Sequence, residues 1–122
     1  MKPETKIELQ ACDLIYGNLG VGSLKLNVKA NTGYPDRVFW IPGGKPLFVE
    51  FKTPDGELSE KQKYHIERLR KDGYNVEVCD NAIDAFHAAI RAVEATNLSE
   101  EGRKILARAR KKLSLLLQKR VI

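Results

Sequence analysis

The sequence predicts a single α/β domain in which helices flank a mixed central sheet. Its 122 residues, 43% hydrophobic and 30% charged, suffice for one buried core and leave no long disordered stretch. Helical and strand-like patterns follow one another in the order helix, three strands, helix, strand, helix, helix. Because each helical stripe needs an apolar surface to cover, a sheet between helices is the natural arrangement.

The first half of the chain predicts one helix and three strands. Pro3 suits a first helical turn, and apolar residues follow at helical spacing until Gly17, which predicts a helix over about residues 3–16. Apolar and polar residues alternate in "LKLNVK", residues 24–29, as in a half-buried strand. Residues 38–41 and 47–51 are rich in β-branched and aromatic side chains around "PGGK", and they predict a hairpin.

The next segments predict a helix and a fourth strand. Ser59 and Gln62 have the spacing of a capping box, and Gly73 ends the helix that they begin. "YNVEVC", residues 74–79, then reads as a short strand. A helix between two strands allows a right-handed crossover, which makes the fourth strand parallel to a neighbour.

Two further helices complete the chain, and the final one is strongly basic. Asp80 or Asn81 caps the third helix, Asn97 ends it, and Ser99 caps the last. From Arg103 onward there are eight Lys or Arg residues and no acid, so the rest of the chain carries a net charge of −3 out of an overall +5.

Four of these basic residues are candidates for contacts with a polyanion, because they lie largely opposite the apolar stripe of the helix: Lys104, Arg108, Lys111 and Lys112. Solvated basic faces are also common on proteins that bind nothing charged. We expect residues 1–96 to form the main domain. Residues 97–122 form a basic amphipathic helix that belongs to the same compact unit or serves as a dimer arm.

Cysteine usage and hydropathy exclude several classes of protein. Cys12 and Cys79 are far apart and form no CxxC or Cys/His cluster, so neither a disulfide framework nor a zinc site is expected. The first ten residues are too charged for a signal peptide, and no apolar run approaches the roughly 20 residues that span a bilayer. We therefore expect an intracellular protein.

The hairpin carries three charged residues in a segment that otherwise favours burial: Asp36, Glu50 and Lys52. Residues two apart in a strand point to the same face, so Glu50 and Lys52 point the same way. A three-residue hairpin loop would place Asp36 opposite Glu50, with Cβ atoms about 5 Å apart, whereas a four-residue loop would place it opposite Phe51. The sequence leaves this register open.

Two carboxylates at such a separation repel each other and need a cation between them. Mg²⁺ fits, because it takes oxygen ligands and is typically held by one or two carboxylates with phosphate oxygens and water. The backbone carbonyl of Phe51 could supply another oxygen. Lys52 could orient or deprotonate an attacking water, or neutralise charge on a phosphate. A solvated salt bridge on an exposed hairpin explains the same charged residues without a metal.

Three segments, "GYPDR", "FVEFKTPDGELSEKQ" and "LRKDGYNVEV", together resemble the VRR-NUC domain of the PD-(D/E)XK nuclease superfamily, in its small stand-alone form found in phages and bacteria. The resemblance extends over about residues 4–86. The family pattern is a Gly-x-Pro-Asp, a Glu-x-Lys at the end of the next strand and a Gln in the following helix, present here as Gly33, Pro35, Asp36, Glu50, Lys52 and Gln62.

This resemblance implies a restriction-endonuclease-like core, dependence on Mg²⁺ or Mn²⁺, and hydrolysis of DNA phosphodiester bonds. Carried over by position, Asp36 and Glu50 match the metal ligands and Lys52 the catalytic lysine. Gln62 matches a helix glutamine that works near the metal, although its position also suits a helix cap without any active site.

An acidic residue on the first helix also belongs to the family pattern, and Glu4 and Glu8 compete for that position. Glu4 precedes Ile7 in the expected Glu-x-x-apolar order and is the preferred candidate, although acids in a first turn usually complement the helix dipole or face solvent. Lys25 and Lys29 lie near the "GYPD" loop and are candidate phosphate contacts.

Stand-alone members of the family resemble Holliday-junction resolvases and act as dimers on branched DNA. The resemblance therefore implies a homodimer that cuts four-way junctions or flaps in the cytoplasm of a bacterial cell, with a phage as a candidate source, and no membrane or small-molecule partner. The alternatives are a general or nicking DNA endonuclease, a DNA-binding module that kept the fold without catalysis, and a structural protein whose acids are merely solvated.

Overall fold

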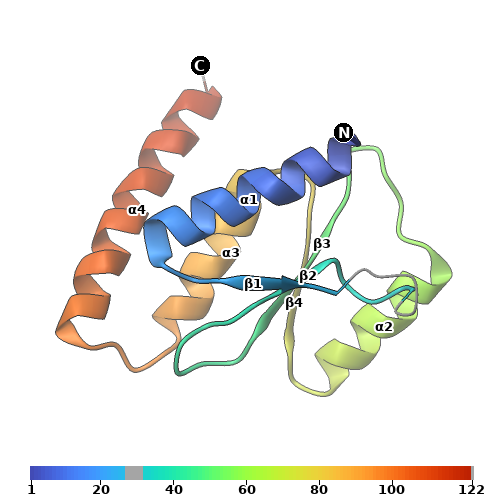
Figure 1. Ribbon diagram of the computed structural model, residues 1–122, viewed down its shortest axis with the longest axis horizontal. Helices are drawn as coiled ribbons and strands as arrows, with labels where there is room; N and C mark the ends of the chain where they lie inside the picture. The colour runs from blue at the N-terminus through green and yellow to red at the C-terminus, as the bar shows by residue number, and fades with distance from the viewer. Residues whose placement is uncertain (27–31, 122) are drawn as a thin grey trace.

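Helices and strands follow one another in the predicted order in the computed structural model of the protein, which describes residues 1–26 and 32–121 (Figure 1). The elements are α1 (Pro3–Leu19), β1 (Ser23–Lys25), β2 (Arg37–Phe39), β3 (Leu47–Phe51), α2 (Glu60–Lys71), β4 (Asn75–Cys79), α3 (Ala82–Glu94) and α4 (Glu100–Val121). The predicted α/β class with a mixed sheet is confirmed.

The sheet has the strand order β1-β2-β3-β4. β1, β2 and β3 pair antiparallel, and β4 joins β3 in parallel after the crossover through α2. Arg37 pairs with Val49 and Phe39 with Leu47, and the same register sets Asp36 opposite Glu50. Of the two registers that the sequence leaves open, the structure has the one that brings the two acids together.

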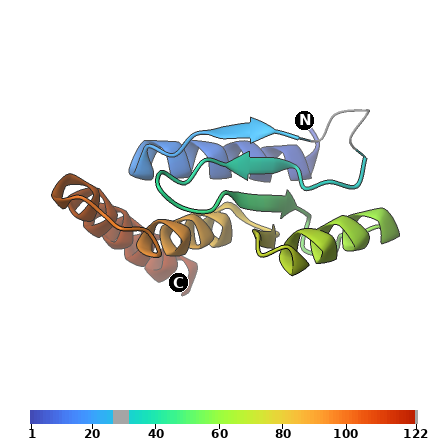
Figure 2. The same ribbon diagram turned by 90° about the horizontal axis from the view of Figure 1, so that it is seen from below.

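Helices cover the two faces of the sheet unequally, as Figures 1 and 2 show. α1 and α3 cover one face, and α4 packs against both of them. Inward-facing residues of β2 and β3, such as Phe39 and Val49, join apolar residues of these three helices in one buried cluster. On the other face α2 packs against β4, where Ile66 and Val76 are buried.

One predicted boundary in the N-terminal third needs correction, and another falls outside the described residues. Helix α1 continues through Gly17 and ends at Gly20, whose φ of 69° closes the helix in the left-handed conformation. A mid-helix glycine costs only about 1 kcal/mol, which packing of the helix offsets. The strand predicted over residues 24–29 is described only as Ser23–Lys25, and its remainder falls largely on residues 27–31, outside the described ranges.

The burial of β1 also differs from the expected half-buried strand. Leu24 is 53% exposed, because α2 covers the β4 side of its face and leaves the β1 side open. Lys25 lies on the opposite face, where its ammonium group reaches the carboxylate of Glu8 on α1. The polar residue of the alternating pair therefore faces the helix, and the apolar residue faces solvent.

The last helix, α4, packs against α1 and α3. The Ser99 hydroxyl accepts a hydrogen bond from the Gly102 N–H at 3.0 Å, as the predicted cap requires. Leu106, Ala109 and Leu113 of α4 are buried in the common core. No helix within the described ranges is both long enough and apolar enough to cross a membrane.

Candidate active site

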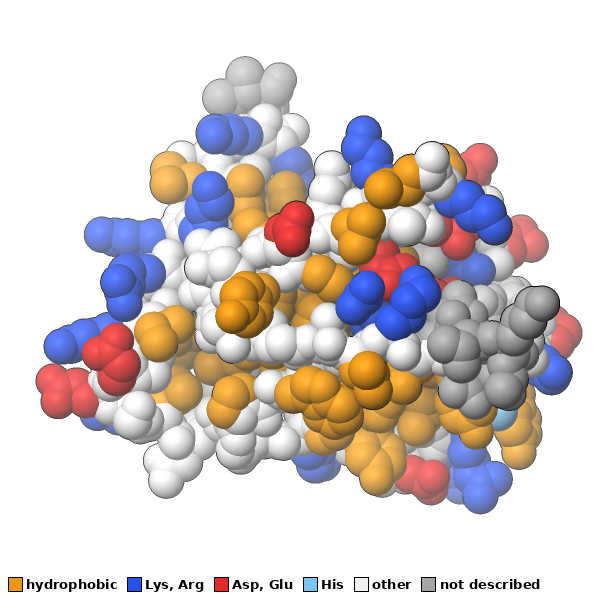
Figure 3. Space-filling model, viewed as in Figure 1, with side chains coloured by type: hydrophobic (Ala, Val, Ile, Leu, Met, Phe, Trp, Pro, Cys, Tyr) orange, Lys and Arg blue, Asp and Glu red, His pale blue; other side chains and the backbone are white. Residues whose placement is uncertain are grey.

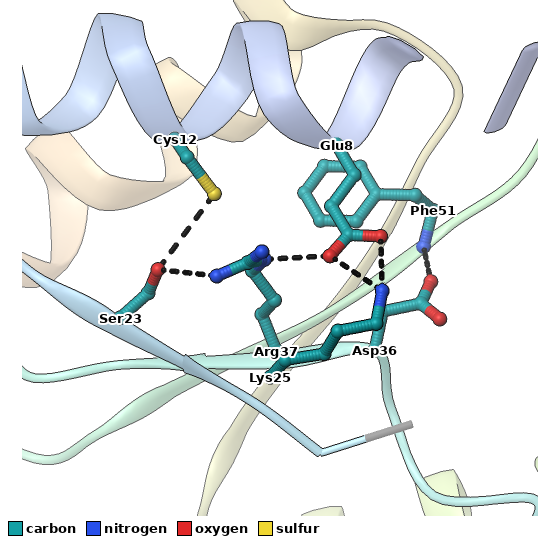
Figure 4. Close-up of polar contacts among 7 residues, drawn as sticks. All are labelled: Glu8, Cys12, Ser23, Lys25, Asp36, Arg37 and Phe51. Atoms are coloured by element: carbon teal, nitrogen blue, oxygen red, sulfur yellow. Dashed lines mark hydrogen bonds and ion pairs between the residues drawn. The ribbon is translucent and has the colours of Figure 1, made fainter. Parts of the chain in front are cut away.

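The two acids of the hairpin meet at the carboxyl end of β3. Glu50 is the penultimate residue of the strand, and Asp36 directly precedes β2. The Asp36 carboxylate accepts a hydrogen bond from the backbone N–H of Phe51 at 2.7 Å (Figure 4). Asp36 is only 7% exposed and Glu50 only 2%. Because acids are seldom buried without a specific role, this burial argues against a solvated salt bridge.

The Glu50 carboxylate uses its two oxygens differently. Oε2 accepts a hydrogen bond from Gln62 Nε2 at 3.0 Å and lies 3.5 Å from Lys52 Nζ. Oε1 is buried and has no hydrogen-bond partner among the described residues. A buried oxygen left without a donor costs free energy unless something else binds there.

Gln62 caps α2 and also contacts Glu50. Its side-chain oxygen accepts from the Ser59 N–H at 2.9 Å, while the Ser59 hydroxyl accepts from the Gln62 N–H at 3.1 Å. This capping box starts α2. Since the oxygen of the amide is held by the cap, the NH₂ group is the end that faces Glu50. The cap thereby fixes which way the amide is oriented in the site.

Burial and the neighbouring acid raise the pKa of Glu50 from 4.5 to about 7. Removal of the carboxyl from water is the larger cause, and the charge of Asp36 adds to it. The charge of Lys52 acts in the opposite direction and lowers the pKa, but only in part. The site thus holds more negative charge than its own lysine neutralises.

A tight turn on α2 places Asp36. Gly33 has a φ of 92°, and a Cβ at this position would lie 2.9 Å from both His65 and Lys61 of the helix. The next residue, Tyr34, stacks its ring on His65, with centroids 4.0 Å apart and an interplanar angle of 22°. The same helix therefore supports the turn that carries Asp36 and supplies the glutamine that holds Glu50.

The carbonyl of Phe51 has a favourable place for its predicted role. In a strand the N–H and C=O groups of one residue point to the same side, and the Phe51 N–H points at Asp36. Its carbonyl therefore faces the side on which Asp36 lies. No group of three or more His, Cys, Asp or Glu side chains within the described ranges is arranged to hold a metal ion.

The two candidate acids of α1 have different surroundings. Glu4 is exposed, whereas Glu8 is 4% exposed and lies under β1 and β2. Glu8 Oε2 is 2.6 Å from Arg37 Nε and 3.2 Å from Lys25 Nζ. The metal role of either acid stays a prediction. Arg37, which the sequence analysis did not single out, could have been noticed as a charged residue inside a buried strand.

The predicted basic residues of α4 are not brought to the acids. α4 lies at the opposite end of the molecule from α2, in both Figure 1 and Figure 2. Of these residues, Arg108 pairs with Glu101 of the same helix at 3.9 Å. Lys25 is much closer to the site, since it pairs in the sheet with the residue that follows Asp36. Lys29 lies outside the described residues.

Comparisons with known proteins show what the chain is similar to. A solved structure described as a VRR_NUC domain superposes with a TM-score of 0.61 and 28% identity, over 70% of this chain and 91% of the other. Fanconi-associated nuclease 1 of Danio rerio is 46% identical over 48 residues, which are 38% of this chain. The match spans only 5% of that relative's length.

The family model of the VRR-NUC domain matches residues 23–82. That span contains the tight turn at Gly33, both buried acids, Lys52 and Gln62. Residues 23–82 therefore match the VRR-NUC domain family, and the fold of the chain is similar to that of a solved VRR_NUC domain.

Proposed function

We propose that the protein is a DNA endonuclease that depends on Mg²⁺ or Mn²⁺ and hydrolyses phosphodiester bonds, with branched DNA such as four-way junctions or flaps as its leading substrate. One observation carries the proposal: Asp36, Glu50, Lys52 and Gln62 converge at the end of β3 around a buried carboxylate oxygen without a partner. The similarity to a protein named as a nuclease supports the same reaction class.

The donor set fits a hard divalent cation. Glu50 offers a buried oxygen, Asp36 lies beside it, and the Phe51 carbonyl faces the same side. These are oxygen ligands, which Mg²⁺ prefers, and two carboxylates leave positions for phosphate oxygens and water. When bound, the ion would acidify a water and neutralise negative charge on the phosphate. It would also relieve the excess negative charge that raises the pKa of Glu50.

The remaining residues have roles that their contacts support. Lys52 is 15% exposed at its side chain and lies beside Glu50, where its ammonium group can hold the attacking water or a phosphate oxygen. Gln62 keeps Oε2 of Glu50 occupied and so leaves Oε1 as the oxygen for the ion. With a pKa of about 7, Glu50 must lose a proton before it can act as a ligand in neutral or acidic solution.

A cleavage assay on a synthetic four-way junction with Mg²⁺ tests the proposal. We expect Glu50→Gln and Lys52→Ala to abolish cutting and to keep much of the DNA binding. Glu67→Gln removes an exposed carboxyl from α2 and is the matched control, with cutting unchanged. If Glu50→Gln and Lys52→Ala cut as fast as the native protein, the assignment of the site is wrong.

Substrate panels separate the branched-DNA proposal from its alternatives. Equal cutting of duplex, flap and four-way DNA would indicate a general or nicking endonuclease. Binding of DNA without any Mg²⁺- or Mn²⁺-dependent cutting would indicate a non-catalytic binding module.

A homodimer with twofold symmetry would present two such sites to two strands of a junction. The exposed basic face of α4, with Lys104, Lys111 and Lys112, would then contact an arm of the DNA. Sedimentation of the protein alone and with a junction tests the dimer, because a monomer in both states contradicts it. Loss of junction binding by the triple Lys→Met variant of α4 tests the contact.

A further inference from the structure

A buried carboxylate next to the proposed active site holds two cations at once. Glu8 of α1 is 4% exposed, and its Oε2 lies 2.6 Å from Arg37 Nε. The ammonium group of Lys25 lies 3.3 Å from Oε1 and 3.2 Å from Oε2 of the same carboxylate. Figure 4 shows the three side chains gathered between α1 and the ends of β1 and β2, with Asp36 close by.

Arg37 donates to one oxygen of the buried acid, Oε2, and matches its single negative charge. Its guanidinium also donates to the Ser23 hydroxyl through Nη1 at 3.2 Å, so two contacts fix its plane. A guanidinium fixed in this way is already oriented before any ligand arrives, and less entropy is lost when it binds one. The second cation, Lys25, donates to both oxygens of Glu8, and with it the positive charge of the cluster exceeds the negative charge by one.

The excess positive charge faces outward. The Glu8 side chain is 5% exposed, the Arg37 side chain 17% and the Lys25 side chain 46%. Two cations and one anion leave a net charge of +1, with the anion underneath. On the surface in Figure 3, Lys and Arg side chains stand in front of an acidic one to the right of centre, on the face crossed by α1 and β1.

The backbone ties these cations to the proposed active site. Arg37 directly follows Asp36, and Lys25 is its partner in the sheet. The next residue of β1, Leu26, donates its N–H to the Asp36 carbonyl at 2.7 Å. A DNA strand carries a phosphate at every nucleotide, so a strand cut at the acids has neighbouring phosphates on both sides of the cut.

We propose that Lys25 and Arg37, held by Glu8, bind the phosphate next to the one that is cut. The proposal rests on the proposed function. In it, Glu8 is a positioning residue that acts through the two cations. The contact is with the phosphate backbone, so it adds affinity and sets the position of the strand without reading the base sequence.

Salt titrations of DNA binding test the phosphate site. The probe is a fluorescein-labelled four-way junction, its anisotropy is measured without divalent metal, and every variant is made in the Glu50→Gln protein so that no cutting occurs. We expect Lys25→Met and Arg37→Met each to reduce the slope of log K against log salt by about 0.9, because one phosphate contact is lost. Lys71→Met removes an exposed charge at the far end of α2 and is the matched control, with an unchanged slope.

The Glu8→Gln variant tests whether Glu8 positions Lys25 and Arg37 or only contributes to the overall charge of the protein. The substitution makes the protein more positive by one charge, so unspecific electrostatics alone would tighten DNA binding. If Glu8 positions the cations, affinity does not rise, and cleavage at saturating DNA falls at least about tenfold in the otherwise native protein. Tighter binding with unchanged cleavage overturns the positioning role. Circular dichroism and thermal melting verify that the variants fold. If Arg37→Met does not fold, the salt titration of Lys25→Met still tests the phosphate site, because the Lys25 side chain is half exposed.

The outcomes distinguish this inference from the proposed function. Unchanged slopes in a protein that cuts DNA with Mg²⁺ overturn the phosphate site alone. Reduced slopes in a protein that never cuts support the phosphate site and overturn the nuclease. Absence of DNA binding overturns both.

Discussion

The buried Glu50 carboxylate should destabilise the protein when no metal is present. Its pKa is raised from 4.5 to about 7 by burial and by Asp36. Folding therefore favours the protonated form of Glu50. Its contribution to the free energy of unfolding is fully present below pH 4.5 and is lost as the pH rises through 7. At about 1.4 kcal/mol per pKa unit, the loss amounts to about 3 kcal/mol above pH 7. The Glu50→Gln substitution keeps the shape of the side chain without its charge. Above pH 7 the variant should therefore be more stable than the native protein.

Urea unfolding with a chelator present measures this difference. We expect Glu50→Gln to exceed the native free energy of unfolding by up to about 3 kcal/mol at pH 8 and by little at pH 4.5. Comparison at each pH cancels the titration of the other groups. Glu67→Gln, the exposed control, should stay within about 0.5 kcal/mol of the native protein at both pH values.

Added Mg²⁺ extends the test. An ion that binds the folded site should stabilise the native protein at pH 8 and narrow its gap to Glu50→Gln, because binding to the folded state alone adds stability. If Glu50→Gln is no more stable than the native protein at pH 8 without metal, then burial imposes no cost on this carboxylate. The reasoning from charge to metal site would then be refuted.

Three further outcomes are expected. Gln62→Glu sets a second carboxylate where the amide now donates to Glu50 at 3.0 Å, and it should slow single-turnover cleavage at least about tenfold. Gly33→Ala combines a φ of 92° with a Cβ that would lie 2.9 Å from His65, and urea unfolding should show a loss of about 1–3 kcal/mol. Burial raises the pKa of the Cys79 thiol to about 12, so mass spectrometry should find it unalkylated by iodoacetamide at pH 8 until the protein unfolds.

The parts of the fold that local chemistry determines could be predicted from the sequence. The order of the elements, the capping box at Ser59 and the parallel fourth strand follow from spacing and from short-range contacts, and the structure has all three. The register of the hairpin could be narrowed to two possibilities. The sequence could not decide between them, because a turn rich in Gly and Pro accommodates more than one loop length.

Features that depend on packing between distant segments could not be predicted. Glu4 and Glu8 are one helical turn apart and share a face, so spacing cannot tell which of them is buried. The choice depends on Arg37 and Lys25, which come from two strands formed later in the chain. Leu24 is exposed for a similar reason, since its burial depends on how far α2 extends across the sheet.

The amide of Gln62 links the formation of the first turn of α2 to the placement of the Glu50 carboxylate. Because one end closes the first turn of α2 and the other end holds the Glu50 carboxylate, fraying of that turn also releases the carboxylate. A chain whose second helix has not yet formed would lack an ordered ligand for the ion. Under the proposed function, newly made or partly unfolded protein would be unable to cut DNA until folding is complete.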